Sequence, residues 1–340
     1  MLDIRLIVID FDGTLMGSGN EFHLYNTFRD KIQEFQMTKN AAWAVCTGRS
    51  RESFRHVFES MRLIGIVPNY LIIRHAYIYS LTRFGYMPHF TWNLRTRHLL
   101  WMERLRVCNV LEECCDMAAG SASRGGCIRR TKNWARMRFD SEETTASVAN
   151  MVREKIKPYR NLRMLKFVRE IDIRLVPFTK GLAVSELARH IGIGKENVLT
   201  IGDGHNDISM FDANVASYTG CPVNAEPEVM EIVFERRGHI AKSRFLTGVV
   251  EILDAHTTGT VCSDLPDGWK KPELRENPSS NHIHHGRHES HVVRNITCLV
   301  ATLYVVLMVF ASFKMIPHLS GPIMMPIRLL VKLLVKITAK

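Results

Sequence analysis

The chain has 340 residues, 46% of them hydrophobic, which is enough to form one large or two modest globular domains and excludes disorder throughout. The formal net charge of +11 is unevenly placed, because residues 95–174 hold 18 Lys and Arg against 10 Asp and Glu. Nucleic acid, phosphorylated metabolites or anionic lipid would all suit such a balance. Since no nucleic-acid motif is present, we expect no nucleic-acid partner.

The N-terminus and the cysteines indicate the cellular compartment. The apolar run at 6–9 is bracketed by Arg5 and Asp10 and is too short for a signal peptide, so we expect a buried strand there. Eight cysteines are scattered without a CxxC pair. This usage favours reduced thiols and a cytoplasmic location for the folded domains.

Short apolar runs that end at small or acidic residues predict buried parallel strands covered by helices on both faces. Helix-like stretches at 21–36 and 180–191 alternate with these runs. The pattern predicts an α/β fold whose core is a Rossmann-like parallel sheet, formed by residues 1–74 and 178–256. The runs are 4–9, 41–46 and 197–201.

Residues 75–177 interrupt this core and are expected to form an inserted α+β cap domain, with helices near 95–117 and 141–157. Within 130–138, basic and aromatic side chains at alternate positions would share one face of a strand. That face is either solvated or forms a wall facing an anion, and both interpretations stay open. The side chains are those of Arg130, Lys132, Trp134, Arg136 and Arg138.

The C-terminal part has a different composition. Residues 257–291 are polar and end in NHIHHGRHESH, which indicates a His-rich linker. Its histidines could bind a transition metal, although a linker lacks the fixed geometry of a specific site, and this alternative stays open. Residues 296–313 carry no charge, and as a helix they would reach about 27 Å. We therefore expect a transmembrane helix at 292–314, followed by a basic amphipathic tail at 315–340 that lies on the membrane. A surface-lying arrangement of both segments stays open.

Two carboxylates follow the first strand, where open α/β sheets bind ligands: Asp10 and Asp12 in the run DFDGT. Carboxylates this close repel each other unless a divalent cation lies between them, and oxygen ligands favour Mg2+. A turn or a helix cap followed by Gly13 and Thr14 would also explain the run when it is taken alone.

Three later segments make that simpler explanation insufficient. In CTGR, Thr47 offers a hydroxyl to phosphate and Gly48 allows close approach of the backbone. Lys180 begins a helix after PFT, where both its charge and the helix N-terminus favour an anion. In GDGHND, Asp203 and Asp207 lie in a Gly-rich turn after the last apolar strand. Each feature is weak alone, but together, at strand ends and a helix start, they indicate a phosphate site.

With DFDGT, CTGR, the Lys of FTKG and GDGHND, the chain resembles the haloacid dehalogenase superfamily of phosphohydrolases over 1–74 and 178–256. The position of the insert is similar to the Cof-type and sucrose-phosphate-phosphatase-like branch, in which an α/β cap selects the substrate. The resemblance implies a Mg2+-dependent phosphatase acting on a small phosphorylated metabolite of the sugar- or polyol-phosphate type.

The resemblance also implies roles for individual residues. Asp10 would be the nucleophile that forms an aspartyl phosphate, and Asp12 the acid that protonates the leaving oxygen and then activates water. The implied phosphate-binding residues are Thr47, Gly48, Lys180 and Asn206. The implied Mg2+ ligands are Asp10, Asp12 through its backbone carbonyl, Asp203 and Asp207.

One departure from the family pattern lies where the chain leaves the core for the cap. Relatives commonly carry Asn-Gly-Ala there, whereas this chain has Arg74 and His75 before Ala76. The unusual pair either alters the hinge or contacts the substrate. It leaves the expected reaction class intact but weakens any transfer of a substrate from a particular relative.

Other functions stay open at this stage. A phosphomutase or a P-type pump would keep the aspartyl phosphate, but pumps resemble DKTGT and lack the second carboxylate. The membrane segment suggests a lipid-phosphate phosphatase or phosphotransferase as an alternative. A membrane-tethered binding module without turnover is a third possibility, which the complete set of motif residues disfavours.

Overall fold

The computed structural model describes residues 2–17, 22–121, 128–131 and 133–271. The expected transmembrane helix at 292–314 and the basic tail lie outside these residues. Among the helices of the described ranges, none combines the length and the apolar character that crossing a membrane requires.

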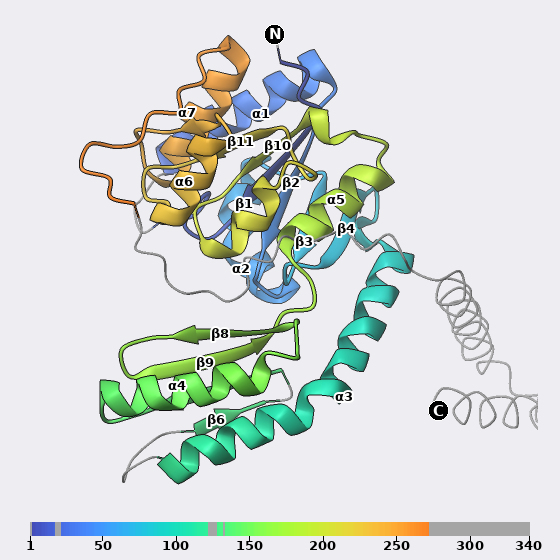
Figure 1. The fold of residues 1–340 in the computed structure, drawn as a ribbon. Helices are drawn as coiled ribbons and strands as arrows, with labels where there is room; N and C mark the ends of the chain where they lie inside the picture. The colour runs from blue at the N-terminus through green and yellow to red at the C-terminus, as the bar shows by residue number, and fades with distance from the viewer. Residues whose placement is uncertain (1, 18–21, 122–127, 132, 272–340) are drawn as a thin grey trace, which may run out of the picture. The chain divides into compact units, whose positions relative to one another are not determined.

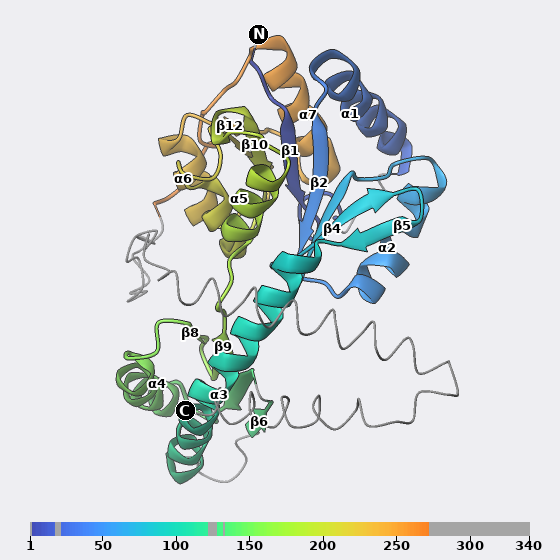
Figure 2. The same cartoon turned by 90° about the vertical axis from the view of Figure 1, so that its right-hand side faces the viewer.

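A central eight-stranded sheet organises the core. Its strands are β1 (Leu6–Asp10), β2 (Ala42–Thr47), β3 (Tyr70–Ile73), β4 (Tyr77–Thr82), β5 (Gly85–Pro88), β10 (Val198–Ile201), β11 (Tyr218–Cys221) and β12 (His239–Ile240). They lie in the order β12-β11-β10-β1-β2-β3-β4-β5 (Figures 1 and 2). The six strands from β12 to β3 are parallel, whereas β4 and β5 are antiparallel to their neighbours. The expected parallel α/β core is therefore confirmed.

Helices cover both faces of this sheet. Along β1, Ile7 and Ile9 belong to one hydrophobic cluster, and Leu6 and Val8 belong to another. The first cluster includes side chains of α1, α2 and α7, and the second includes side chains of α5. Burial on both faces explains why β1 is a continuous apolar run. The helical elements are η1 (Phe22–Leu24), α1 (Tyr25–Lys39), α2 (Arg51–Leu63), α5 (Lys180–His190), η2 (Lys195–Asn197), η3 (His205–Phe211), α6 (Pro227–Glu235) and α7 (Phe245–Thr258).

Strands β4 and β5 extend the core sheet although they fall within the range 75–177 that the sequence suggested for the cap. The chain reverses directly after β3 in a turn at Arg74 and His75, and β4 pairs back along β3. The apolar side of β4 is thereby buried, with Ile78 only 1% exposed in the α5-side cluster. Because the chain reverses within this short turn, β4 pairs with β3, and the hairpin of β4 and β5 belongs to the core sheet.

The remainder of the insert is an α+β unit with its own hydrophobic cluster. Val107 and Leu111 of α3, and Val148 of α4, pack with Ile171 and Ile173 of β9. The strands form a second, antiparallel sheet in the order β6-β7-β9-β8 (Figure 1). The elements are α3 (Phe90–Ser121), β6 (Ile128–Arg130), β7 (Trp134–Arg138), α4 (Glu142–Ile156), β8 (Leu162–Lys166) and β9 (Glu170–Leu175).

The prediction that 130–138 forms one strand with a single basic face was wrong. Arg130 ends β6 and lies opposite Ala135 of β7, so its side chain is on the same face as Ala135. Trp134, Arg136 and Arg138 share the other face of β7. The turn between the two strands shifts the alternation, and so the pattern is broken after Arg130.

The basic side chains of β7 are paired with carboxylates of β9. Asp172 accepts hydrogen bonds from Arg136 at 2.8 Å and from Arg174 at 2.7 Å. Glu170 pairs with Arg138 at 3.1 Å. Because Asp172 is buried, these contacts hold its pKa below its usual value despite the opposing effect of burial. The face is therefore a network of ion pairs, and neither of the two sequence interpretations describes it fully.

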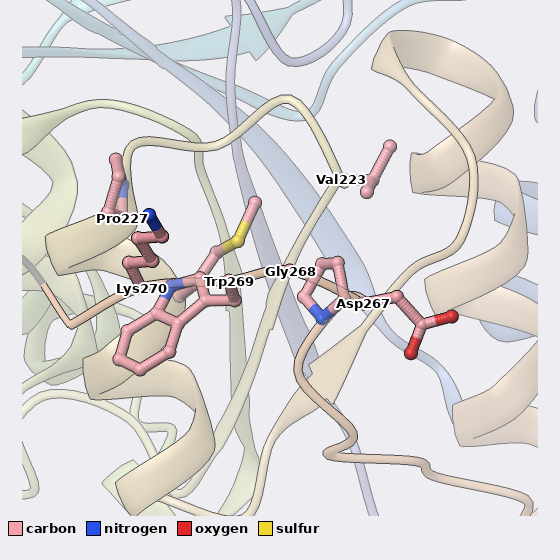
Figure 3. A pocket seen from close by; sticks show the side chains of 8 residues that line it. Val223, Pro227, Asp267, Gly268, Trp269 and Lys270 are labelled. Atoms are coloured by element: carbon pink, nitrogen blue, oxygen red, sulfur yellow. The ribbon is translucent and has the colours of Figure 1, made fainter.

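The polar segment expected to be a linker from residue 257 packs against the core as far as residue 271. Helix α7 ends at Thr258, and the backbone N–H of Ile240 then donates to the carbonyl of Cys262 at 2.9 Å. Trp269 packs beside α6 and, with Pro227 and neighbouring residues, lines a shallow pocket (Figure 3). Apolar side chains spaced among polar ones give this segment its contacts.

Candidate active site

Asp10 and Lys180 meet at the carboxyl end of β1. Asp10 continues the face of Leu6 and Val8, which is the face that α5 covers. Lys180 is the first residue of α5, whose N-terminus is capped by the Thr179 hydroxyl. The Lys180 ammonium donates a short hydrogen bond to Asp10, and Lys180 is only 1% exposed. Strand register and helix start together therefore bring two charged groups into a buried contact.

Asp203, in the Gly-rich turn before η3, and Asp207, in the first turn of η3, approach this pair. Lys180 donates a second hydrogen bond to Asp207 at 2.5 Å. The other oxygen of Asp207 accepts the backbone N–H groups of Asp203 and Gly204, at 3.1 and 3.0 Å. Asp203 in turn accepts the hydroxyl of Thr14 at 2.6 Å. Backbone N–H groups thus orient Asp207, and the Thr14 hydroxyl orients Asp203.

Three carboxylates around one ammonium leave the site short of positive charge. Burial raises the pKa of Asp10 to about 8, against the opposing effect of Lys180, and raises that of Asp203 to about 6. Burial would lower the pKa of Lys180, but Asp207 and Asp10 outweigh it, and the net shift is upward. Oxygens of Asp10, Asp203 and Asp207 lie within 4.8 Å of one another. Their type and spacing fit a divalent cation that prefers oxygen ligands.

Gly13 lets the first motif approach the acidic turn. Its φ of +85° favours glycine, and a Cβ at this position would lie 2.2 Å from a carboxylate oxygen of Asp203. The carbonyl of Gly13 accepts the side-chain amide of Asn224 at 2.8 Å, and Asn224 also accepts the backbone N–H of Phe245. Asn224 was not predicted from the sequence. Its position just after β11, at the ligand-binding edge of the sheet, is the signal that could have identified it.

Asp12 does not join the cluster around Lys180. Its carboxylate accepts the guanidinium of Arg49, at 2.6 Å from Nη2 and 2.8 Å from Nε. Arg49 also lies 5.7 Å from the centre of the Phe11 ring. Arg49 was not predicted as a site residue, although it belongs to the motif CTGR.

The remaining expected site residues have different environments. Thr47 is fully buried, and its hydroxyl oxygen accepts the backbone N–H of Arg49 at 3.1 Å. Gly48 lies against the imidazole of His75. A Cβ on Gly48 would be only 2.6 Å from Nε2. Asn206 is exposed on η3. The structure therefore gathers Asp10, Lys180, Asp203 and Asp207, with Asp12 turned toward Arg49.

Comparison with known proteins finds similarity to hydrolases and phosphatases. Residues 139–249 match a family described as haloacid dehalogenase-like hydrolase. A 5-amino-6-(5-phospho-D-ribitylamino)uracil phosphatase of Bacillus subtilis is 25% identical over 270 residues, covering 74% of this chain and 95% of the relative. A phosphoglycolate phosphatase of Methanosarcina mazei is 25% identical over 126 residues, or 37% of this chain and 50% of the relative.

Solved structures share the fold. The sucrose-phosphatase of Synechocystis, solved with sucrose and phosphate, has a TM-score of 0.53 at 18% identity, covering 76% of this chain and 99% of its own. A haloacid dehalogenase-like hydrolase of Bacillus subtilis has a TM-score of 0.52 at 14% identity, covering 76% and 94%. The family match over 139–249 and the phosphatases among the relatives support a haloacid dehalogenase-like hydrolase. The names of the curated relatives support a phosphatase.

Proposed function

We propose that the chain hydrolyses a small phosphorylated metabolite of the sugar- or polyol-phosphate type, using Mg2+ and an aspartyl phosphate formed on Asp10. The observation that carries this proposal is the buried contact of Asp10 with Lys180, beside Asp203 and Asp207. The likeness to a relative named for a ribityl phosphate supports the polyol-phosphate class.

In the proposed reaction, a carboxylate oxygen of Asp10 attacks the phosphorus atom while the bond to the leaving oxygen breaks. Asp12 gives a proton to that oxygen, then takes one from the water that attacks the aspartyl phosphate. Phosphate leaves and Asp10 is regenerated. Arg49 holds the Asp12 carboxylate through two nitrogen atoms, and we assign it as the residue that positions Asp12 for both proton transfers.

The other residues hold the phosphoryl group and the metal. The Lys180 ammonium offsets negative charge on the phosphoryl oxygens, and the Thr47 hydroxyl, the Gly48 backbone and the Asn206 side chain are proposed as further contacts. When bound, Mg2+ supplies positive charge next to the transferring phosphoryl group. Its proposed ligands are Asp10, the backbone carbonyl of Asp12, Asp203 and Asp207, the last directly or through water.

Two features outside the core belong to this proposal. The α+β unit from α3 to β9 acts as the substrate-selecting cap, and the core that it serves includes the hairpin of β4 and β5. The uncharged run at 296–313, with the basic residues that follow it, attaches the protein to a membrane and leaves the catalytic domain in the cytoplasm. Sedimentation with anionic vesicles, compared between the full chain and one ending at 277, checks the attachment, and equal sedimentation would contradict it.

The reaction is tested by hydrolysis of para-nitrophenyl phosphate. We expect turnover that requires Mg2+, is abolished by EDTA and is lost in Asp10→Asn, which keeps the size of the side chain but removes the nucleophile. A screen of sugar, polyol, nucleotide and lipid phosphates then identifies the substrate class. Absence of Mg2+-dependent turnover, or full turnover in Asp10→Asn, would overturn the mechanism.

A further inference from the structure

The turn between β3 and β4 holds two adjacent side chains in the left-handed region of backbone space. Arg74 has a φ of 52° and His75 a φ of 61°. Tight hairpin turns usually place Asn, Asp or Gly in this region, because a β-carbon is disfavoured there. An unfavourable backbone conformation next to an active site is a reason to look for a function of the side chain it carries.

This turn is fixed to the loop that follows β2. The backbone N–H of His75 donates to the carbonyl of Thr47 at 3.0 Å, and that of Arg74 donates to the carbonyl of Arg49 at 3.1 Å. The two bonds place the imidazole of His75 on Gly48, where a Cβ would lie 2.6 Å from Nε2 and 2.7 Å from Cε1. The missing side chain of Gly48 therefore makes room for the ring.

The environment of the ring determines its protonation. Burial, together with the positive charge of Lys180, lowers the pKa of His75 to about 4, so the imidazole is neutral at pH 7 and carries one N–H. Nδ1 is buried, and no described residue hydrogen-bonds to it. A buried N–H without a partner is rarer than a buried acceptor without one, which assigns the proton to Nε2, on the side of Gly48.

Building on the function proposed above, we propose that His75 is a substrate-contacting residue whose Nε2–H donates a hydrogen bond to a phosphoryl oxygen bound beside Gly48. A neutral donor here adds a directed contact without adding a second buried cation to the one that Lys180 provides. Because the contact is to the phosphoryl group, it acts on every phosphate ester and on inorganic phosphate itself.

Binding of inorganic phosphate to the full-length protein with Mg2+, measured by calorimetry, tests the contact without requiring turnover. We expect His75→Gly to weaken the Kd roughly tenfold, as loss of a hydrogen bond to a charged group would. Glycine suits the φ of this position, so the turn should persist. His75→Gln, whose amide can reach toward the same site, should restore part of the affinity.

Arg74→Gly is the matched control, because it changes the neighbouring residue of the same turn and removes an exposed side chain. Its Kd for phosphate should equal that of the unmodified protein. If His75→Gly does not fold, His75→Asn, which also tolerates a positive φ, replaces it with the same expected loss. An unchanged Kd in the folded variant, or an equal loss in Arg74→Gly, would overturn the role of His75. Failure of the proposed reaction would appear separately, as absence of turnover in the unmodified protein.

Discussion

Arg49 holds the carboxylate of Asp12 through two nitrogen atoms, with Nη2 at 2.6 Å and Nε at 2.8 Å from the same oxygen. The two residues come from the loops after β2 and β1, adjacent strands of the sheet. The contact fixes the side chain that we propose as the proton donor and acceptor. It also turns that side chain away from the Lys180 cluster, so the two carboxylates of DFDGT have distinct environments.

We predict that Arg49→Ala lowers kcat by roughly tenfold or more with a smaller effect on KM, because general acid–base catalysis contributes roughly 10²–10⁴-fold and depends on position. The kcat of Arg49→Lys should lie between those of the unmodified protein and Arg49→Ala, since Lys keeps the charge but cannot form the two-nitrogen contact. Steady-state kinetics with para-nitrophenyl phosphate measure both variants. The control is Arg62→Ala, which removes an exposed ion pair with Glu59 and should leave kcat unchanged. Equal kcat in all variants would exclude the positioning role.

Lys180 should contribute to stability as well as to chemistry. Lys180→Met leaves Asp10 and Asp207 buried without their shared cation, and we expect the free energy of unfolding to fall by about 3–5 kcal/mol. Urea unfolding in EDTA measures this loss. Lys31→Met, which breaks a partly exposed pair with Asp254, should cost under about 1 kcal/mol. An equal loss of free energy of unfolding in Lys180→Met and Lys31→Met would contradict the stabilising role of Lys180.

Gly13 and Gly65 both have a positive φ, but only at Gly13 would a Cβ also clash with another side chain. Gly13→Ala introduces a Cβ that would lie 2.2 Å from Asp203, whereas Gly65 has nearly the same φ and no atom within 4 Å of such a Cβ. Both substitutions should cost about 1 kcal/mol of strain. In addition, Gly13→Ala should raise the Mg2+ concentration needed for activity by roughly 10–100-fold, because it displaces an oriented carboxylate. A Mg2+ titration that shifts equally in both variants would contradict this assignment.

His256 makes stability depend on pH. Burial in α7 lowers its pKa to about 4, although its Nδ1 contacts the carbonyl of Ile252. The unfolded chain, with a His pKa near 6.5, therefore binds more protons than the folded chain between these values, and stability falls as pH decreases below about 6.5. From pH 7 to pH 5 this single group should remove about 2 kcal/mol. Denaturant unfolding at both pH values, compared with His256→Gln, measures its share. The same pH dependence in both proteins would assign the loss to other groups.

The sequence predicts the core of the site well, because each motif directly follows a strand or begins a helix. Asp10, Asp203 and Asp207 converge because the carboxyl ends of parallel strands share one edge, and Lys180 reaches them from the start of α5. The Asp12–Arg49 contact depends on side-chain conformations across 37 residues of sequence, which no local pattern records.

The hairpin of β4 and β5 was assigned to the cap because residues 75–177 as a whole interrupt the pattern of the core. Arg74 and His75 are not typical turn residues, so they carry no signal for the tight reversal. The segment up to residue 271 resembled a linker by composition. Its packing depends on tertiary contacts such as those of Trp269 with α6, and these contacts overrule its polar composition.

The phosphorylation state of Asp10 during turnover is the most direct test of the account. The full-length protein is mixed with para-nitrophenyl phosphate and Mg2+, quenched in acid within one turnover and mapped by peptide mass spectrometry. We predict a phosphoryl group on the peptide that contains Asp10, absent in EDTA and in Asp10→Asn, and accumulating in Asp12→Asn if the second step is slowed more than the first. Turnover with no modified Asp10 peptide at any quench time, or with the phosphoryl group on another residue, would contradict the central claim.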